Sequence, residues 1–206
     1  MSWVTGKGWN FRQTASHATD GTDEVKWPTA DNGNLDGAYP ISGNGTNYGR
    51  TLPVSSVDGS RDNLNFTDRR LAGIVFRQNT ATQFAFRVDL PATGLYRIRL
   101  GGGRYSFGPN VNYVRVLDDA TALITLAGVS TGNDQFYDAA GNVHTKANWP
   151  TNNVAVDVTF STTTLILQVG QNSGADSTAS VCSHLFIQQV PPTPAFGRYG
   201  VRGPIR

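Results

Sequence analysis

The sequence has few of the residues that build long helices or cross-link a chain. Glu24 is its only glutamate, and only three of its 206 residues are lysine. Both types favour helix, and no ten-residue stretch shows helical periodicity, so a helical protein is disfavoured. Cys182 is the only cysteine, which excludes an intrachain disulfide framework and favours its interpretation as a small buried hydrophobic residue.

Long apolar runs and strong net charge are missing as well. No run approaches the ~20 apolar residues of a membrane helix, and residues 1–7 lack the pattern of a secretory signal. The net charge of +2 argues against a dedicated nucleic-acid surface. We therefore expect neither a membrane partner nor a specific nucleic-acid partner.

The stretch from Gln83 to Leu100 determines the expected architecture. Phe84, Phe86, Val88 and Leu90 alternate with more polar residues, as in a strand with one buried face. The segment 91–94, Pro-Ala-Thr-Gly, has turn chemistry, and Tyr96, Ile98 and Leu100 alternate after it. We predict a β-hairpin in the middle of a sandwich core.

Further strand-like runs divide the chain into three parts. They cover residues 71–76, 111–117, 122–126, 154–160, 164–169 and 181–190, with a polar loop at 127–153. About eight strands predict an all-β fold, an antiparallel β-sandwich of the jelly-roll type over 71–190. The expected core includes Phe86, Val88, Tyr96, Ile98, Val156, Val158 and Leu167.

The two flanking parts differ in character. Residues 1–70 are rich in turns and either pack on the sandwich or reach beyond it as an arm. Trp3, Trp9 and Trp27 favour packing. Residues 191–206 begin with prolines that prevent the last strand from continuing, and form an extended arm.

Three segments carry a resemblance to a known family. Residues 88–100 resemble the pro-ala-x-gly-x-tyr strand pair of galactose-binding-like jelly rolls, which include many carbohydrate-binding modules. Residues 160–169 and 184–188 are similar to later strands of that family. The resemblance covers roughly residues 70–190 and implies the jelly-roll fold, which hosts many unrelated binding roles.

No constellation of catalytic residues is visible. His17, His144 and His184 lie apart, without a triad pattern or metal-ligand spacing. Asp118 and Asp119 are adjacent at an expected hairpin tip, which indicates a solvated turn. We expect a protein that is not an enzyme.

Two loops have partial ligand signatures. Residues 32–37 mimic the first half of a calcium loop, but the twelfth position is Gly43 where a bidentate glutamate is needed. The glycine-rich segment 101–108 follows a strand and opens no helix, which indicates a mobile loop and not a phosphate cradle. We expect no metal site and no cofactor.

Two groups of residues are candidates for binding. In the 127–153 loop, Trp149 and Tyr137 could stack on a sugar while Asn148 and Asn152 bind its hydroxyls, or the aromatic rings could simply fix the loop. The tail has aromatic and arginine side chains suited to a protein partner, or is a frayed end. These tail residues are Phe196, Arg198, Tyr199, Arg202 and Arg206.

The whole design favours a structural role. A single jelly roll with adhesive ends resembles the auxiliary proteins of bacteriophage virions, such as capsid decoration proteins. We therefore expect a non-enzymatic virion component, made in the host cytoplasm, that forms a homo-oligomer and contacts capsid or other virion subunits. The alternative is a secreted carbohydrate-binding, lectin-like module that binds a glycan.

Overall fold

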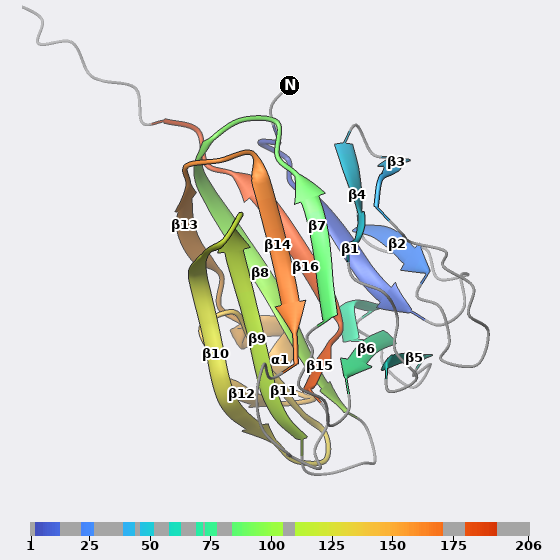
Figure 1. The fold of residues 1–206 in the computed structure, drawn as a ribbon. Helices are drawn as coiled ribbons and strands as arrows, with labels where there is room; N and C mark the ends of the chain where they lie inside the picture. The colour runs from blue at the N-terminus through green and yellow to red at the C-terminus, as the bar shows by residue number, and fades with distance from the viewer. Residues whose placement is uncertain are drawn as a thin grey trace, which may run out of the picture.

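The computed structural model describes residues 3–12, 22–26, 39–43, 46–51, 58–62, 69–71, 73–77, 84–104, 110–170 and 180–192. These residues form an all-β sandwich, with two larger sheets that face each other and a smaller sheet at one end (Figure 1). The fold class expected from the sequence is confirmed. The only helical elements in these ranges are the 3-10 turn η1 (Arg69–Leu71) and the single turn α1 (Trp149–Asn152).

The first large sheet is built around β8 (Gly94–Arg104) and β16 (His184–Gln189). Its strand order is β12 (Val143–Thr145), β11 (Gln135–Tyr137), β8, β16, β1 (Lys7–Arg12) and β2 (Thr22–Lys26). The strand β13 (Val156–Phe160) also pairs with β8. All of these pairings are antiparallel except that of β1 with β2, which is parallel.

The second large sheet is antiparallel throughout. Its order is β10 (Thr121–Thr131), β9 (Asn110–Asp118), β14 (Thr164–Val169), β7 (Phe84–Asp89), β4 (Thr46–Arg50) and β3 (Ile41–Gly43). The small sheet contains β15 (Ser180–Cys182), β6 (Gly73–Arg77) and β5 (Asp58–Asp62). The expected hairpin after residue 111 is confirmed, because β9 and β10 pair directly across Asp119 and Ala120.

The expected hairpin between Gln83 and Leu100 is wrong. β7 pairs with β4 and β14, whereas β8 pairs with β16, β13 and β11, so the two strands lie in different sheets. The turn at residues 91–93 carries the chain from one sheet to the other, and the Tyr96 hydroxyl donates to the Ala92 carbonyl at 2.6 Å. The turn residues and the alternation fit an arch between sheets as well as a hairpin, because alternation specifies which face is buried but not which strand is the neighbour.

The predicted core is otherwise confirmed. Phe86, Val88, Tyr96, Ile98 and Leu167 are fully buried. Val156 and Val158 pack against this core and are only partly buried, since β13 lies at an edge of its sheet.

The described part of the N-terminal segment belongs to the sandwich itself. Trp9 and Phe11 on β1 are fully buried, and Trp9 packs against Tyr48 of β4 and Phe86 of β7 at centroid distances of 5.7 and 6.0 Å. The predicted start of the sandwich at residue 71 is therefore too late. Both β1 and β4 hydrogen-bond to strands of the expected 71–190 domain.

The last strand of the sandwich ends where the prolines predict. Val190 N–H donates to the Leu95 carbonyl at 2.9 Å, and Pro191 and Pro192 are then exposed. Residues 193–206, which contain all five predicted partner-binding residues, lie outside the described residues, as do His17 and the calcium-like residues 32–37.

Candidate functional site

The backbone of the connection from β10 to β13 can approach β8 closely because Gly101 and Gly103 have no side chains. A Cβ atom on Gly101 would lie 2.6 Å from the Tyr137 carbonyl oxygen, and one on Gly103 would lie 2.1 Å from the Gln135 carbonyl oxygen. Gly101–Gly103 are buried residues of β8. The expectation of a mobile loop beginning at residue 101 is therefore wrong for these three positions, where the absence of side chains serves strand packing.

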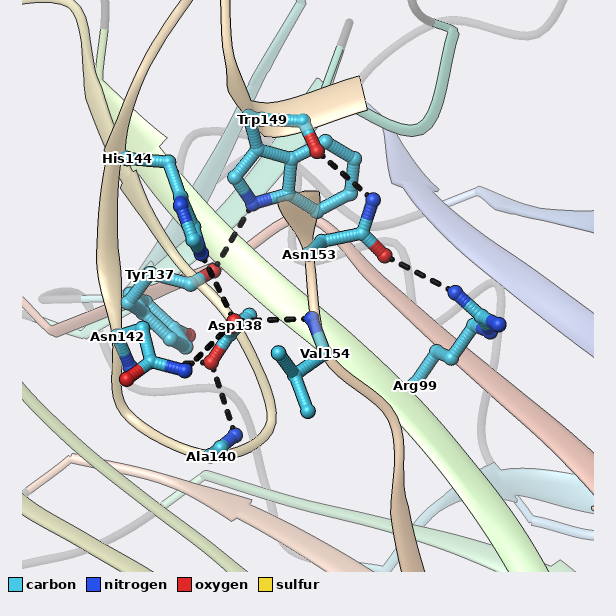
Figure 2. A network of polar contacts seen from close by, with 9 residues as sticks. All are labelled: Arg99, Tyr137, Asp138, Ala140, Asn142, His144, Trp149, Asn153 and Val154. Atoms are coloured by element: carbon cyan, nitrogen blue, oxygen red, sulfur yellow. Dashed lines mark hydrogen bonds and ion pairs between the residues drawn. The ribbon is translucent and has the colours of Figure 1, made fainter. Parts of the chain in front are cut away.

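Asp138 holds this connection together. Its Oδ1 accepts from the backbone N–H groups of Ala140 at 2.9 Å and Asn142 at 3.0 Å (Figure 2). Its Oδ2 accepts from Val154 N–H at 2.9 Å and Asn142 Nδ2 at 3.2 Å, and lies 2.8 Å from His144 Nε2. Burial tends to raise the pKa of this carboxyl, but the bonds from His144, Val154 and Asn142 outweigh it, so the pKa is lowered.

Trp149 of α1 is covered on several sides. Its side chain is fully buried, and its indole N–H donates to the Tyr137 carbonyl at 3.3 Å. The Arg70 guanidinium carbon lies 4.8 Å from the centroid of the ring, and His184 packs edge-on at 5.3 Å. Figure 2 shows the attachment of this turn to β8, where Asn153 links the Trp149 carbonyl oxygen to Arg99.

These contacts correct the predicted sugar platform. Tyr137 is also fully buried, and its hydroxyl donates to the Val181 carbonyl at 2.5 Å. Neither ring presents a face to solvent, so the other interpretation, a loop fixed by its own aromatic side chains, describes the structure. Asn148 and Asn152 are exposed at the two ends of α1.

The remaining titratable candidates are also engaged in packing. Burial raises the pKa of the Cys182 thiol to about 12, and the prediction that this cysteine is buried is confirmed. His184 is buried beneath Trp149, and His144 is held by Asp138. The described residues contain no group of three or more His, Cys, Asp or Glu side chains arranged to hold a metal ion.

Asp118 departs from the predicted solvated turn, whereas its neighbour Asp119 is exposed as expected. The Asp118 side chain is buried and receives four hydrogen bonds, two each from Ser161 and Thr162. It thereby joins the end of β9 to the turn between β13 and β14. One carboxylate of the pair is structural and the other faces water.

No role was predicted for Asp138, Asn153 or Arg99. A signal for Asp138 was present, because an aspartate followed by Ala-Ala-Gly is typical of a turn in which the carboxylate accepts from the backbone two residues on. For Asn153 and Arg99 no local pattern exists. Their hydrogen bond at 3.2 Å joins residues 54 positions apart in the chain.

Comparisons with known proteins identify the fold and not a family. No protein-family model and no curated protein matches the sequence. Among solved structures, the YXIM protein of Bacillus subtilis is similar with a TM-score of 0.49 and 17% identity over 90% of this chain. The plant receptor-like kinase FER gives a TM-score of 0.50 and 9% identity, also over 90%.

A Bacteroides uniformis beta-glucuronidase matches over 73% of this chain with a TM-score of 0.43 and 9% identity. The chain spans 40%, 42% and 15% of the lengths of these three proteins, in the same order. Of these three, only the likeness to FER reaches a TM-score of 0.50, and at 9% identity it shows a similarity of fold and nothing about activity. Among the helices described in this chain, none has the length and apolar character needed to cross a membrane.

Proposed function

We propose that this chain is a non-enzymatic attachment protein, an auxiliary or capsid decoration component of a bacteriophage virion. The observation that carries the proposal is the way the chain leaves the sandwich. Directly after β16, Val190 N–H donates to the Leu95 carbonyl, and Pro191 and Pro192 are then exposed. The last described residues, Pro191 and Pro192, therefore lie at the surface of the sandwich.

The chemistry of residues 193–206 suits a protein partner. They combine Phe196, Tyr199 and three arginines and contain no acidic residue. Aromatic and arginine side chains are the commonest anchors of protein interfaces, and arginine forms strong charge-assisted bonds with carboxylates. Such contacts could offset the ordering cost of roughly 1–2 kcal/mol per residue.

The roles of the polar side chains in the sandwich support the same proposal. Asp138, His144 and Asp118 hold loops together, and Cys182 is buried in the core. Within the part of the chain that the structure describes, these four groups therefore have structural roles. The assignment to a virion rests on the overall design, a single sandwich with an adhesive end, and implies synthesis in the host cytoplasm.

The experiment is to remove residues 193–206 and measure attachment to purified virion particles that lack this protein. We expect an unchanged unfolding midpoint, because the deleted segment follows two exposed prolines, and loss of attachment. Replacing Arg198, Arg202 and Arg206 with glutamine should weaken attachment and reduce its salt dependence.

A matched control is Arg97→Gln, which removes an exposed arginine that pairs with Asp157 on the sandwich surface. This variant should attach as the wild type does. If the truncated chain attaches with unchanged affinity and salt dependence, the proposal fails.

The second candidate is carbohydrate binding, and the exposed amides at α1 favour it. Asn148 and Asn152 lie at either end of one helical turn, with Thr151 exposed between them. Amide groups can bind sugar hydroxyls without an aromatic platform. Asn148→Ala with Asn152→Ala should abolish any glycan-induced change in tryptophan fluorescence if this function holds, and should leave particle attachment unchanged if the first proposal holds.

A further inference from the structure

β10 is an unusually long edge strand. It runs for 11 residues, Thr121–Thr131, and among the described residues it pairs with β9 alone. Figure 1 shows it at the outer margin of its sheet. The strand has the sequence TALITLAGVST, with no charged residue and no proline.

Such an edge lacks the protection that other edges have. An unpaired strand presents N–H and C=O groups that can add another strand, and proteins usually block this with charges, prolines or short strands. Other described edge strands are protected in these ways. β12 and β3 are short, with three residues each. β13 carries a charged residue, Asp157, which pairs with Arg97 at 2.8 Å. β10 is long and has neither charge nor proline, and its only irregularities, two register shifts, lie outside residues 124–127.

Two register shifts leave a regular segment in the middle of β10. They fall between Ala122 and Ile124 and between Ala127 and Val129. Within the segment 124–127, Ile124 and Leu126 are 6% exposed and face the core, whereas Thr125 and Ala127 are exposed. The buried alternate residues fix the register, and the exposed ones are small enough to lie beside another strand.

We propose that β10 pairs with β10 of a second copy of this chain, antiparallel and about a two-fold axis, so that the sheet continues across a dimer. An axis perpendicular to the sheet keeps both cores on the same side and pairs residues of the same face. Thr125 then lies opposite Thr125 or Ala127 of the other copy. An uncharged strand meets itself without repulsion, whereas a charged partner would find no complementary side chain on it.

This contact is independent of the C-terminal segment and adds to the proposed attachment function. The segment would hold the particle, and β10 would hold a second copy. Deletion of residues 193–206 should therefore leave the dimer intact. The failure of one proposal can be distinguished from the failure of the other.

The test compares charged variants of the intact chain by sedimentation equilibrium. We expect the wild type to dimerise, and Thr125→Lys and Thr125→Glu each to raise the dissociation constant about tenfold or more, because like charges then face each other. An equimolar mixture of the two variants should recover the dimer, since opposite charges meet across the axis. Thr159→Lys is the matched control, an exposed threonine on β13 of the other sheet, and should dimerise as the wild type does.

Three outcomes would overturn the proposal. The wild type could stay monomeric at the highest concentration measured, Thr125→Lys could dimerise as tightly as Thr159→Lys, or the mixture could fail to restore the dimer. Circular dichroism and unfolding midpoints check that each variant is folded. If Thr125→Lys does not fold, Ala127→Lys and Ala127→Glu repeat the comparison at the other exposed position of the segment.

Discussion

Asp118 allows the most detailed test of how the ends of the sandwich are held. Its Oδ2 accepts from Ser161 N at 2.7 Å and Ser161 Oγ at 2.5 Å, and its Oδ1 accepts from Thr162 N at 3.0 Å and Thr162 Oγ1 at 2.5 Å. Burial tends to raise the pKa of this carboxyl, but the bonds from Ser161 and Thr162 outweigh burial and hold the pKa at about 2. Relative to about 3.9 in an unfolded chain, this shift corresponds to about 2–3 kcal/mol of stability.

We expect Asp118→Asn to lower the free energy of unfolding by about 2 kcal/mol at pH 7. Asparagine has one acceptor oxygen, so its NH2 group faces two of the four donors. Because the folded pKa lies below the unfolded one, the stabilisation is complete above about pH 5 and is lost as the pH falls toward 2. The difference between wild type and variant should therefore shrink to about half by pH 3.

Urea unfolding followed by tryptophan fluorescence at pH 7, 4 and 3 measures this difference. The matched control is Asp119→Asn, because Asp119 is exposed and its φ of 53° suits asparagine. This control should change stability by less than about 0.5 kcal/mol. Equal effects of the two substitutions, or a difference for Asp118→Asn that does not vary with pH, would refute the reasoning.

Three further predictions concern the packing. Phe86→Ala removes a fully buried ring that packs against Trp9 and should cost about 3–5 kcal/mol in urea unfolding; a cost below about 1 kcal/mol would contradict the core assignment. Gly103→Ala places a Cβ 2.1 Å from the Gln135 carbonyl oxygen, so it should speed amide hydrogen exchange in β11, and unchanged exchange would contradict the close approach. Cys182 is fully buried with a pKa of about 12, so its thiol should react with Ellman's reagent at pH 8 only after unfolding; rapid reaction in the native state would contradict its burial.

The sequence allowed the buried faces of the strands and the pairing of β9 with β10 to be predicted, but not the neighbours of β7 and β8. The alternation around Phe86 and Ile98 identified two buried faces correctly. It could not show that β7 and β8 lie in different sheets, because the turn residues at 91–94 fit an arch as well as a hairpin. The pairing depends on contacts with β14 and β16, which are distant in the sequence.

The site was harder to predict, for a related reason. Aromatic residues in a polar loop are compatible with a binding platform or with loop packing. Trp149 and Tyr137 are buried because glycines on another strand, among Gly101–Gly103, have no side chains and leave room for the connection. The carboxylate of Asp118 gains its role from Ser161 and Thr162, which only the fold brings near. Asp138 accepts from donors in its own turn and, in addition, from the more distant Val154 N–H.

In the proposed function, residues 193–206 make the attachment and the sandwich only carries them. Amide hydrogen exchange of the intact chain, free and attached to purified virion particles, tests it most directly. We expect strong new protection in peptides that cover residues 193–206, and unchanged exchange in the loops around Asp138 and α1. Protection that appears around α1, with unchanged exchange in residues 193–206, would contradict it.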